Sequence, residues 1–174
     1  MMTLFAGLSA ASAYAEEDLR TLVRGGCPTE SDCCFGKWKV KADAPLYQTD
    51  DAIDKIGALK AGEVVEATSG RVHSEPGKMK VVFKHGEWKK GDVIGLYSEP
   101  DENGKARFGT AVRTVTEAVP FIVKGSKCDK PTKDCWAVVQ SRPKVKWWLK
   151  VKLPEDRTGW VDATHVATDA ECQL

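Results

Sequence analysis

Hydrophobic and polar residues alternate over short segments along most of the chain, and turn-forming residues separate these segments. The segments with this pattern are 38–40, 45–47, 64–67, 79–83, 93–97, 108–116, 121–123, 136–140, 145–153 and 159–161. Such runs between Gly, Pro, Asn and Asp residues are typical of β-strands. Almost no segment has a helical period, and we expect a single helical turn only at 18–24, within an irregular Cys-rich lead-in at 16–35. The pattern therefore predicts an all-β protein, either a small barrel or a sandwich.

The most regular alternation lies in the strand predicted at 144–153. One face would carry Val145, Trp147, Leu149, Val151 and Leu153, and the other would carry Lys144, Lys146, Trp148, Lys150 and Lys152. We expect the first set in the core and the second on the solvent face. The second set would then be a basic, aromatic surface for an anionic polymer or for a sugar stacked on Trp148. Alternatively, the lysines protect an exposed strand against aggregation and their stems cover Trp148.

Composition narrows the classes of partner. The 174 residues include 26 Lys and Arg against 25 Asp and Glu, which gives a formal net charge of +1. A dedicated nucleic-acid binder usually carries a clear excess of basic charge, so we expect no nucleic-acid partner. Beyond the first fifteen residues no apolar run approaches the roughly 20 residues that a membrane helix needs, so we expect no membrane span.

The N-terminal residues resemble a leader for export. Residues 3–13 are small or apolar and uncharged, Ala13-Tyr14-Ala15 forms an A-x-A cleavage site, and three acidic residues follow it. The basic residue that usually precedes the apolar region is missing, and a short buried helix is the alternative interpretation. We predict a signal peptide at 1–15 and a periplasmic or secreted protein.

An even number of cysteines in an exported chain predicts disulfide bonds. The six are Cys27, Cys33, Cys34, Cys128, Cys135 and Cys172. Cys128 and Cys135 flank a short polar loop and are the simplest pair to join, and Cys172 would tie the C-terminus to the group near the N-terminus. The other pairings stay open among fifteen connectivities. No C-x-x-C pair occurs and no His lies near the first three cysteines, so we expect no metal site.

The chain carries no recognisable catalytic motif. His73, His85 and His165 share none with a Cys, and there is no nucleophile elbow, phosphate-binding loop, zinc-protease motif or dinucleotide fingerprint. We expect neither an enzyme nor a cofactor.

Two stretches of the sequence resemble the bacterial SH3-like (SH3b) domain family. Trp38, Ala44-Pro45-Leu46-Tyr47 and 56–66 are similar to the first half of such a domain. Residues 147–152 and 158–161 are similar to its final strand pair. In the family these halves lie close together in sequence, whereas here a long segment separates them. The resemblance therefore implies one SH3-like barrel made of 36–75 and 142–168. The segment at 76–141 would be an inserted β subdomain, or a second, degenerate SH3-like piece that includes the strand at 91–94. Two tandem barrels are the alternative.

The resemblance also implies a function. Members of this family are mostly non-catalytic, and many bind peptidoglycan. We therefore expect an exported binding module for peptidoglycan or another cell-envelope component. The alternative is a periplasmic protein-interaction or inhibitor module that acts on a protein partner.

Overall fold

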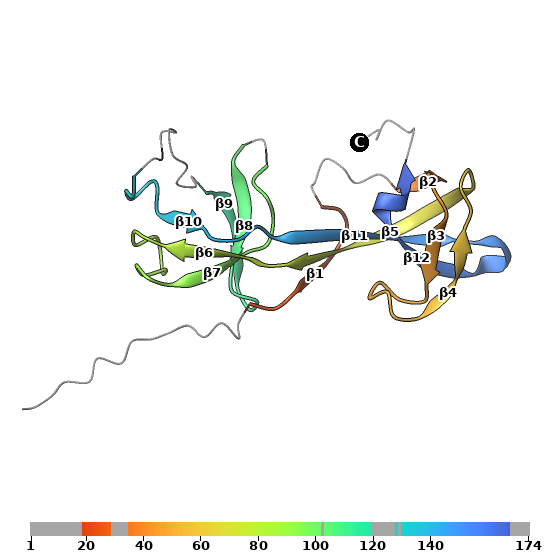
Figure 1. Ribbon diagram of the computed structural model, residues 1–174, viewed down its shortest axis with the longest axis horizontal. Coiled ribbons are helices and arrows are strands. Elements are labelled where there is room, and N and C mark those ends of the chain that lie inside the picture. Colours follow the sequence, from red (N-terminus) through yellow and green to blue (C-terminus); the bar gives the residue numbers. More distant parts are fainter. Residues whose placement is uncertain (1–18, 29–34, 102, 120–127, 129, 168–174) are drawn as a thin grey trace, which may run out of the picture.

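The computed structural model describes residues 19–28, 35–101, 103–119, 128 and 130–167 of the chain. The leader predicted at 1–15, the strand predicted at 121–123, and Cys33, Cys34 and Cys172 lie outside the described residues. The described part is all-β, which confirms the predicted fold class, and it contains no α-helix. Its strands form two sheets at opposite ends of an elongated molecule (Figure 1).

The first sheet is curled into a half-barrel and contains the two longest strands. Its elements are β1 (Leu22–Gly25), β2 (Gly36–Val40), β3 (Ala44–Tyr47), β4 (Lys55–Leu59), β5 (Val64–Glu75), β11 (Lys144–Lys152), β12 (Thr158–Asp162) and β13 (Val166–Ala167). The strand order is β13, β2, β5, β11, β12, β3, β4. Strand β5 is long enough to pair with two strands along one edge, with β2 at 64–67 and with β1 at 71–74.

The core of the first sheet is formed by alternate residues of its strands, those whose side chains point inward. It includes Trp38, Val40, Leu46, Leu59, Val65, Leu149, Val151, Val161 and Val166, all of them buried. Alternate residues of a strand point to opposite faces, so this core leaves the intervening residues of β5, β11 and β12 on the outward face of the half-barrel.

The second sheet lies between β5 and β11 in the sequence and has its own core. Its elements are β6 (Gly77–Val81), β7 (Val93–Leu96), β8 (Lys105–Gly109), β9 (Thr114–Ala118) and β10 (Ala137–Val139), in the order β10, β6, β7, β8, β9. The fully buried side chains of this core include Met79, Val81, Ile94, Leu96, Phe108 and Trp136.

A two-stranded ribbon joins the sheets. Strand β5 leads into β6 after one residue, and β10 returns into β11, so that the two long strands enter and leave the second sheet side by side (Figure 1). At the junction Lys78 donates its backbone N–H to the Ser141 carbonyl at 3.1 Å and accepts from Gln140 at 2.8 Å. A Cβ at Gly77 would collide with the Ser141 backbone, which explains the glycine at this crossing.

Two predicted elements differ from the structure. The single strand predicted at 108–116 is a hairpin, because the backbones of Thr110 and Arg113 bond to each other in a tight turn and Gly109 adopts a φ of 137°. The helical turn predicted at 18–24 is also wrong, because Leu22–Gly25 forms β1 and pairs with β5. Pairing with a long partner strand supplies backbone hydrogen bonds that local sequence does not reveal.

Candidate functional site

The predicted lysine row lies on the outward face of β11. Lys144, Lys146 and Lys152 are exposed and Lys150 is half-buried, whereas Leu149 and Val151 on the opposite face are fully buried. The prediction that Val145 lies in the core is wrong, because this residue is 42% exposed. Val145 lies at the start of β11, in the part of the ribbon that precedes its pairing with β12.

Trp148 is buried, so the prediction that it stands in solvent among the lysines is wrong. Its residue is only 4% exposed. The indole and the ring of Tyr47 form an edge-to-face pair, with ring centroids 5.8 Å apart and ring planes at 88°. Its neighbours across the two flanking strands are Arg71 and Asp162. A sugar therefore has no open face of Trp148 on which to stack.

Trp147 points to the core side of the sheet and is partly buried. Its ring packs edge-on against Trp38, with centroids 5.6 Å apart. Its indole N–H donates to the Gly26 carbonyl at 3.0 Å. Gly70 lies against this indole ring, and a Cβ at Gly70 would come within 2.5 Å of the Trp147 Nε1 atom. The glycine allows this large ring to approach the backbone of β5.

An ion-pair network covers the outward side of the sheet next to Trp148. Asp50, in the connection between β3 and β4, is 7% exposed. Its carboxylate accepts from the Arg71 guanidinium at 3.0 Å and lies 2.6 Å from His73 Nε2. The Arg71 guanidinium also stacks over the ring of Trp160 at 5.3 Å. We call these residues, together with Tyr47 and Trp148, the outer-face cluster.

The electrostatics of Asp50 follow from this geometry. Burial alone would raise the pKa of the Asp50 carboxyl. The hydrogen bond with His73, a bond from its own backbone N–H, and the charges of Arg71 and His73 together hold that pKa below its ordinary value. The network holds the β3–β4 connection against the sheet.

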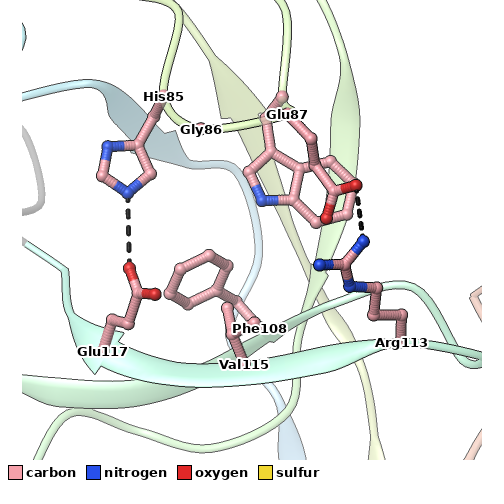
Figure 2. Close-up of a pocket in the computed structure, with 8 residues that line it drawn as sticks. His85, Gly86, Glu87, Phe108, Arg113, Val115 and Glu117 are labelled. Carbon is pink, nitrogen blue, oxygen red and sulfur yellow. Dashed lines mark hydrogen bonds and ion pairs between the residues drawn. The ribbon is translucent and has the colours of Figure 1, made fainter.

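A second feature, which the sequence did not reveal, is an open pocket of about 210 Å³ in the second sheet (Figure 2). It lies between the hairpin tip at 85–88 and the β8–β9 hairpin, and we call it the hairpin pocket. Its lining residues are His85, Gly86, Glu87, Trp88, Phe108, Arg113, Val115 and Glu117.

Two ion pairs connect the walls of the hairpin pocket. Arg113 bonds to Glu87 at 2.9 Å, and His85 Nε2 lies 3.4 Å from Glu117 Oε2 (Figure 2). The His85 imidazole is fixed by stacking on the buried ring of Trp136, with centroids 4.2 Å apart and planes within 2° of parallel. In the sequence His85 and Glu87 belong to one segment and Arg113 and Glu117 to another, and only the packing of the two hairpins brings the two pairs together.

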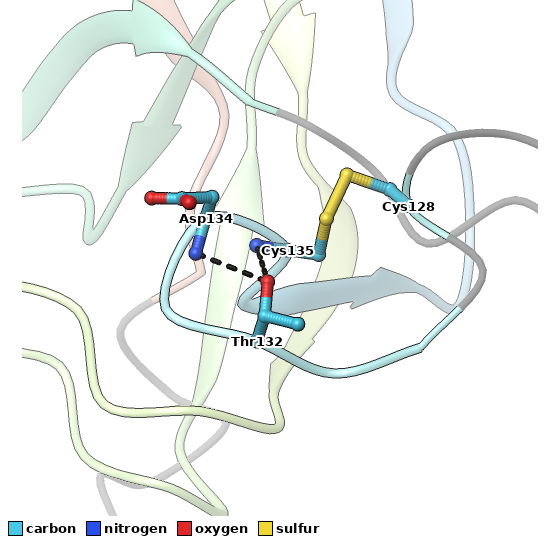
Figure 3. The surroundings of a disulfide bond; sticks show 4 residues. All are labelled: Cys128, Thr132, Asp134 and Cys135. Carbon is cyan, nitrogen blue, oxygen red and sulfur yellow. Dashed lines mark hydrogen bonds between the residues drawn. A yellow bond between two sulfur atoms is a disulfide. The ribbon is translucent and has the colours of Figure 1, made fainter.

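The predicted disulfide between Cys128 and Cys135 is confirmed. Its sulfur atoms are 2.08 Å apart (Figure 3). The closed loop is further ordered by Thr132, whose hydroxyl accepts from the backbone N–H groups of Asp134 at 3.3 Å and Cys135 at 3.0 Å. Cys27 is also disulfide-bonded.

Within the described residues no three His, Cys, Asp or Glu side chains are grouped in a way that could hold a metal ion. The same part of the chain contains no helix that is long and apolar enough to cross a membrane.

Comparison of the chain with models of known protein families, with curated proteins and with solved structures found no match in any of the three.

Proposed function

We propose that this protein is an exported, non-catalytic binding module of the cell envelope, and that the first sheet is an SH3-like half-barrel whose outward face binds peptidoglycan or another anionic envelope component. The observation that carries the proposal is the lysine row on the outward face of β11. The row stands on a strand that pairs with β5 over its whole length, from Lys144 to Lys152, and a surface for a repeating polymer needs such an extended row of charges.

The centre of the row is its most basic part. Lys144 faces Glu75 across β5, with 3.5 Å between the ammonium and the carboxylate, and Lys152 faces Glu66. Lys146 and Lys150 instead face His73 and Ser69, so no acid stands directly opposite them on β5. We call Lys146 and Lys150 the central lysine pair. The two lysines are four positions apart in the strand, which corresponds to about 13 Å.

The outer-face cluster acts as the support for this pair. Trp148 lies between the two lysines in the strand, and its burial against Tyr47 fixes the backbone from which both ammonium groups project. In this proposal Trp148 positions the lysines and does not touch the ligand. The lysines are accessible to solvent, so their attraction to carboxylates falls as salt screens it.

A sedimentation assay on purified cell-wall sacculi tests the proposal. We expect the wild-type protein to be retained at low salt and released as salt rises. Lys146→Gln/Lys150→Gln should lose most of this retention. Lys80→Gln/Lys105→Gln removes the same charge from exposed positions of the second sheet and should keep it. Equal retention of both double variants, or no retention of the wild-type protein, would refute the lysine surface.

The proposed location has its own test. Protein recovered from the envelope fraction should begin at Glu16, because cleavage would follow Ala15. N-terminal sequencing that finds Met1 intact on that protein would contradict export through this leader.

A further inference from the structure

The hairpin pocket has the size of a site for one side chain. Pockets for drug-sized ligands usually measure about 300–1,000 Å³, and this one measures about 210 Å³. Phe108 and Val115 line its centre, between the charged walls (Figure 2). A ligand that fits must therefore combine a short apolar stem with a polar end.

The charge of the lining favours a cation. The lining holds two carboxylates, Glu87 and Glu117, and a single guanidinium, that of Arg113. The guanidinium is already held by Glu87 at 2.9 Å. An incoming anion would meet both carboxylates, whereas a cation would be attracted by them.

Glu117 is the carboxylate that a ligand can reach. Its side chain is 54% exposed, and its 3.4 Å separation from His85 is longer than the 2.7–2.9 Å of a normal charge-assisted hydrogen bond. An ammonium group can therefore bind Glu117 without breaking a strong ion pair.

We propose that the hairpin pocket binds a primary ammonium group on an aliphatic chain, of the kind found in a lysine-type side chain or a free diamine. Glu117 receives the ammonium group, and the partly buried Val115 contacts the methylene stem. This site is separate from the lysine surface on β11 and takes a ligand of opposite charge.

NMR titration of the full oxidised protein tests this site. The probes are Nα-acetyl-L-lysine N-methylamide and 1,5-diaminopentane, and Nα-acetyl-L-norleucine N-methylamide is the uncharged control of similar shape. We expect saturable shifts at the Trp88 indole N–H and at the backbone amides of Gly86 and Glu117, with binding at least about tenfold weaker for the norleucine compound. The tighter of the two amines identifies the source, a peptide side chain or a free diamine.

A matched pair of variants completes the test. Glu117→Gln keeps the shape of the side chain and should weaken amine binding at least about fivefold. Glu99→Gln removes a half-exposed carboxylate that pairs with Arg142 outside the pocket and should leave binding unchanged. Equal shifts with the norleucine compound, no saturable shift with either amine, or equal effects of the two variants would overturn the proposal.

Discussion

Replacing Trp148 by alanine would remove a large buried ring from the outward side of the first sheet. The residue is 4% exposed, and its ring forms an edge-to-face pair with that of Tyr47. An aromatic side chain buries about 150–250 Å², and at about 25 cal/mol per Å² this corresponds to roughly 4–6 kcal/mol. That figure is an upper bound, because the unfolded chain already buries some of this area. Measured substitutions of core aromatic residues by alanine cost about 3–5 kcal/mol.

We therefore expect Trp148→Ala to lower the free energy of unfolding by about 3–5 kcal/mol. Urea denaturation followed by far-ultraviolet circular dichroism, with the disulfides intact, measures this change. Trp148→Phe keeps an aromatic ring and should cost less, which gives a usable measurement if the alanine variant does not fold. Lys150→Ala on the same face should change stability by no more than about 0.5 kcal/mol.

The result that would refute this reasoning is a loss of less than about 1 kcal/mol for Trp148→Ala, with an unchanged denaturant slope. That value is what a ring lying on a lysine-covered surface would give, since surface substitutions rarely cost more. Such a result would mean that the packing against Tyr47 does not hold in solution.

Three other changes probe separate parts of the fold. Gly70→Ala places a methyl group 2.5 Å from the Trp147 Nε1 atom and should cost about 1–3 kcal/mol, and an unchanged Tm would contradict this close approach. The pKa of Asp50 is lowered in the folded state, so its ionised carboxylate stabilises the fold above about pH 4, and this stabilisation is lost on acidification. Asp50→Asn should therefore make the free energy of unfolding fall less steeply at acid pH. Parallel stability–pH curves for the variant and the wild-type protein would disprove the linkage. Cys128→Ala/Cys135→Ala should lose about 2–3 kcal/mol, and peptide mass mapping of the wild-type protein that finds these two thiols free would exclude the bridge.

The alternation in the sequence predicted which face of the sheet each of Trp148 and Lys150 occupies, but it did not predict how deeply that face is buried. A period of two assigns Trp148 and Lys150 to the same side, and both are on it. Whether that side is covered depends on what the neighbouring strands carry. Tyr47, Arg71 and Trp160 come from three other strands, and the connection that carries Asp50 closes over them. No pattern within 144–153 contains this information.

The hairpin pocket could not be predicted for a related reason. Its ion pairs join Glu87 to Arg113 and His85 to Glu117, and each pair crosses between two hairpins. The sequence prediction also treated 108–116 as one strand, which would have placed Arg113 in the middle of a strand and not at a tip. Turn geometry at Gly109 decides that placement. The Cys128–Cys135 bridge was predictable because both ends belong to one short loop.

The ribbon between the sheets has a consequence for the order of folding. β5 and β11 form the centre of the first sheet, yet residues 76–143 separate Glu75 from its partner Lys144. Closing a disordered loop of that length costs about 4 kcal/mol of chain entropy beyond a constant term. Once β6 has paired with β10, the same two residues are held beside each other and most of that entropy is already lost. We therefore expect the second sheet to form before the first and to act as the turn that brings β5 and β11 together. Substitutions in the core of the second sheet should then slow refolding of the whole chain, and those in the core of the first sheet should mainly speed its unfolding.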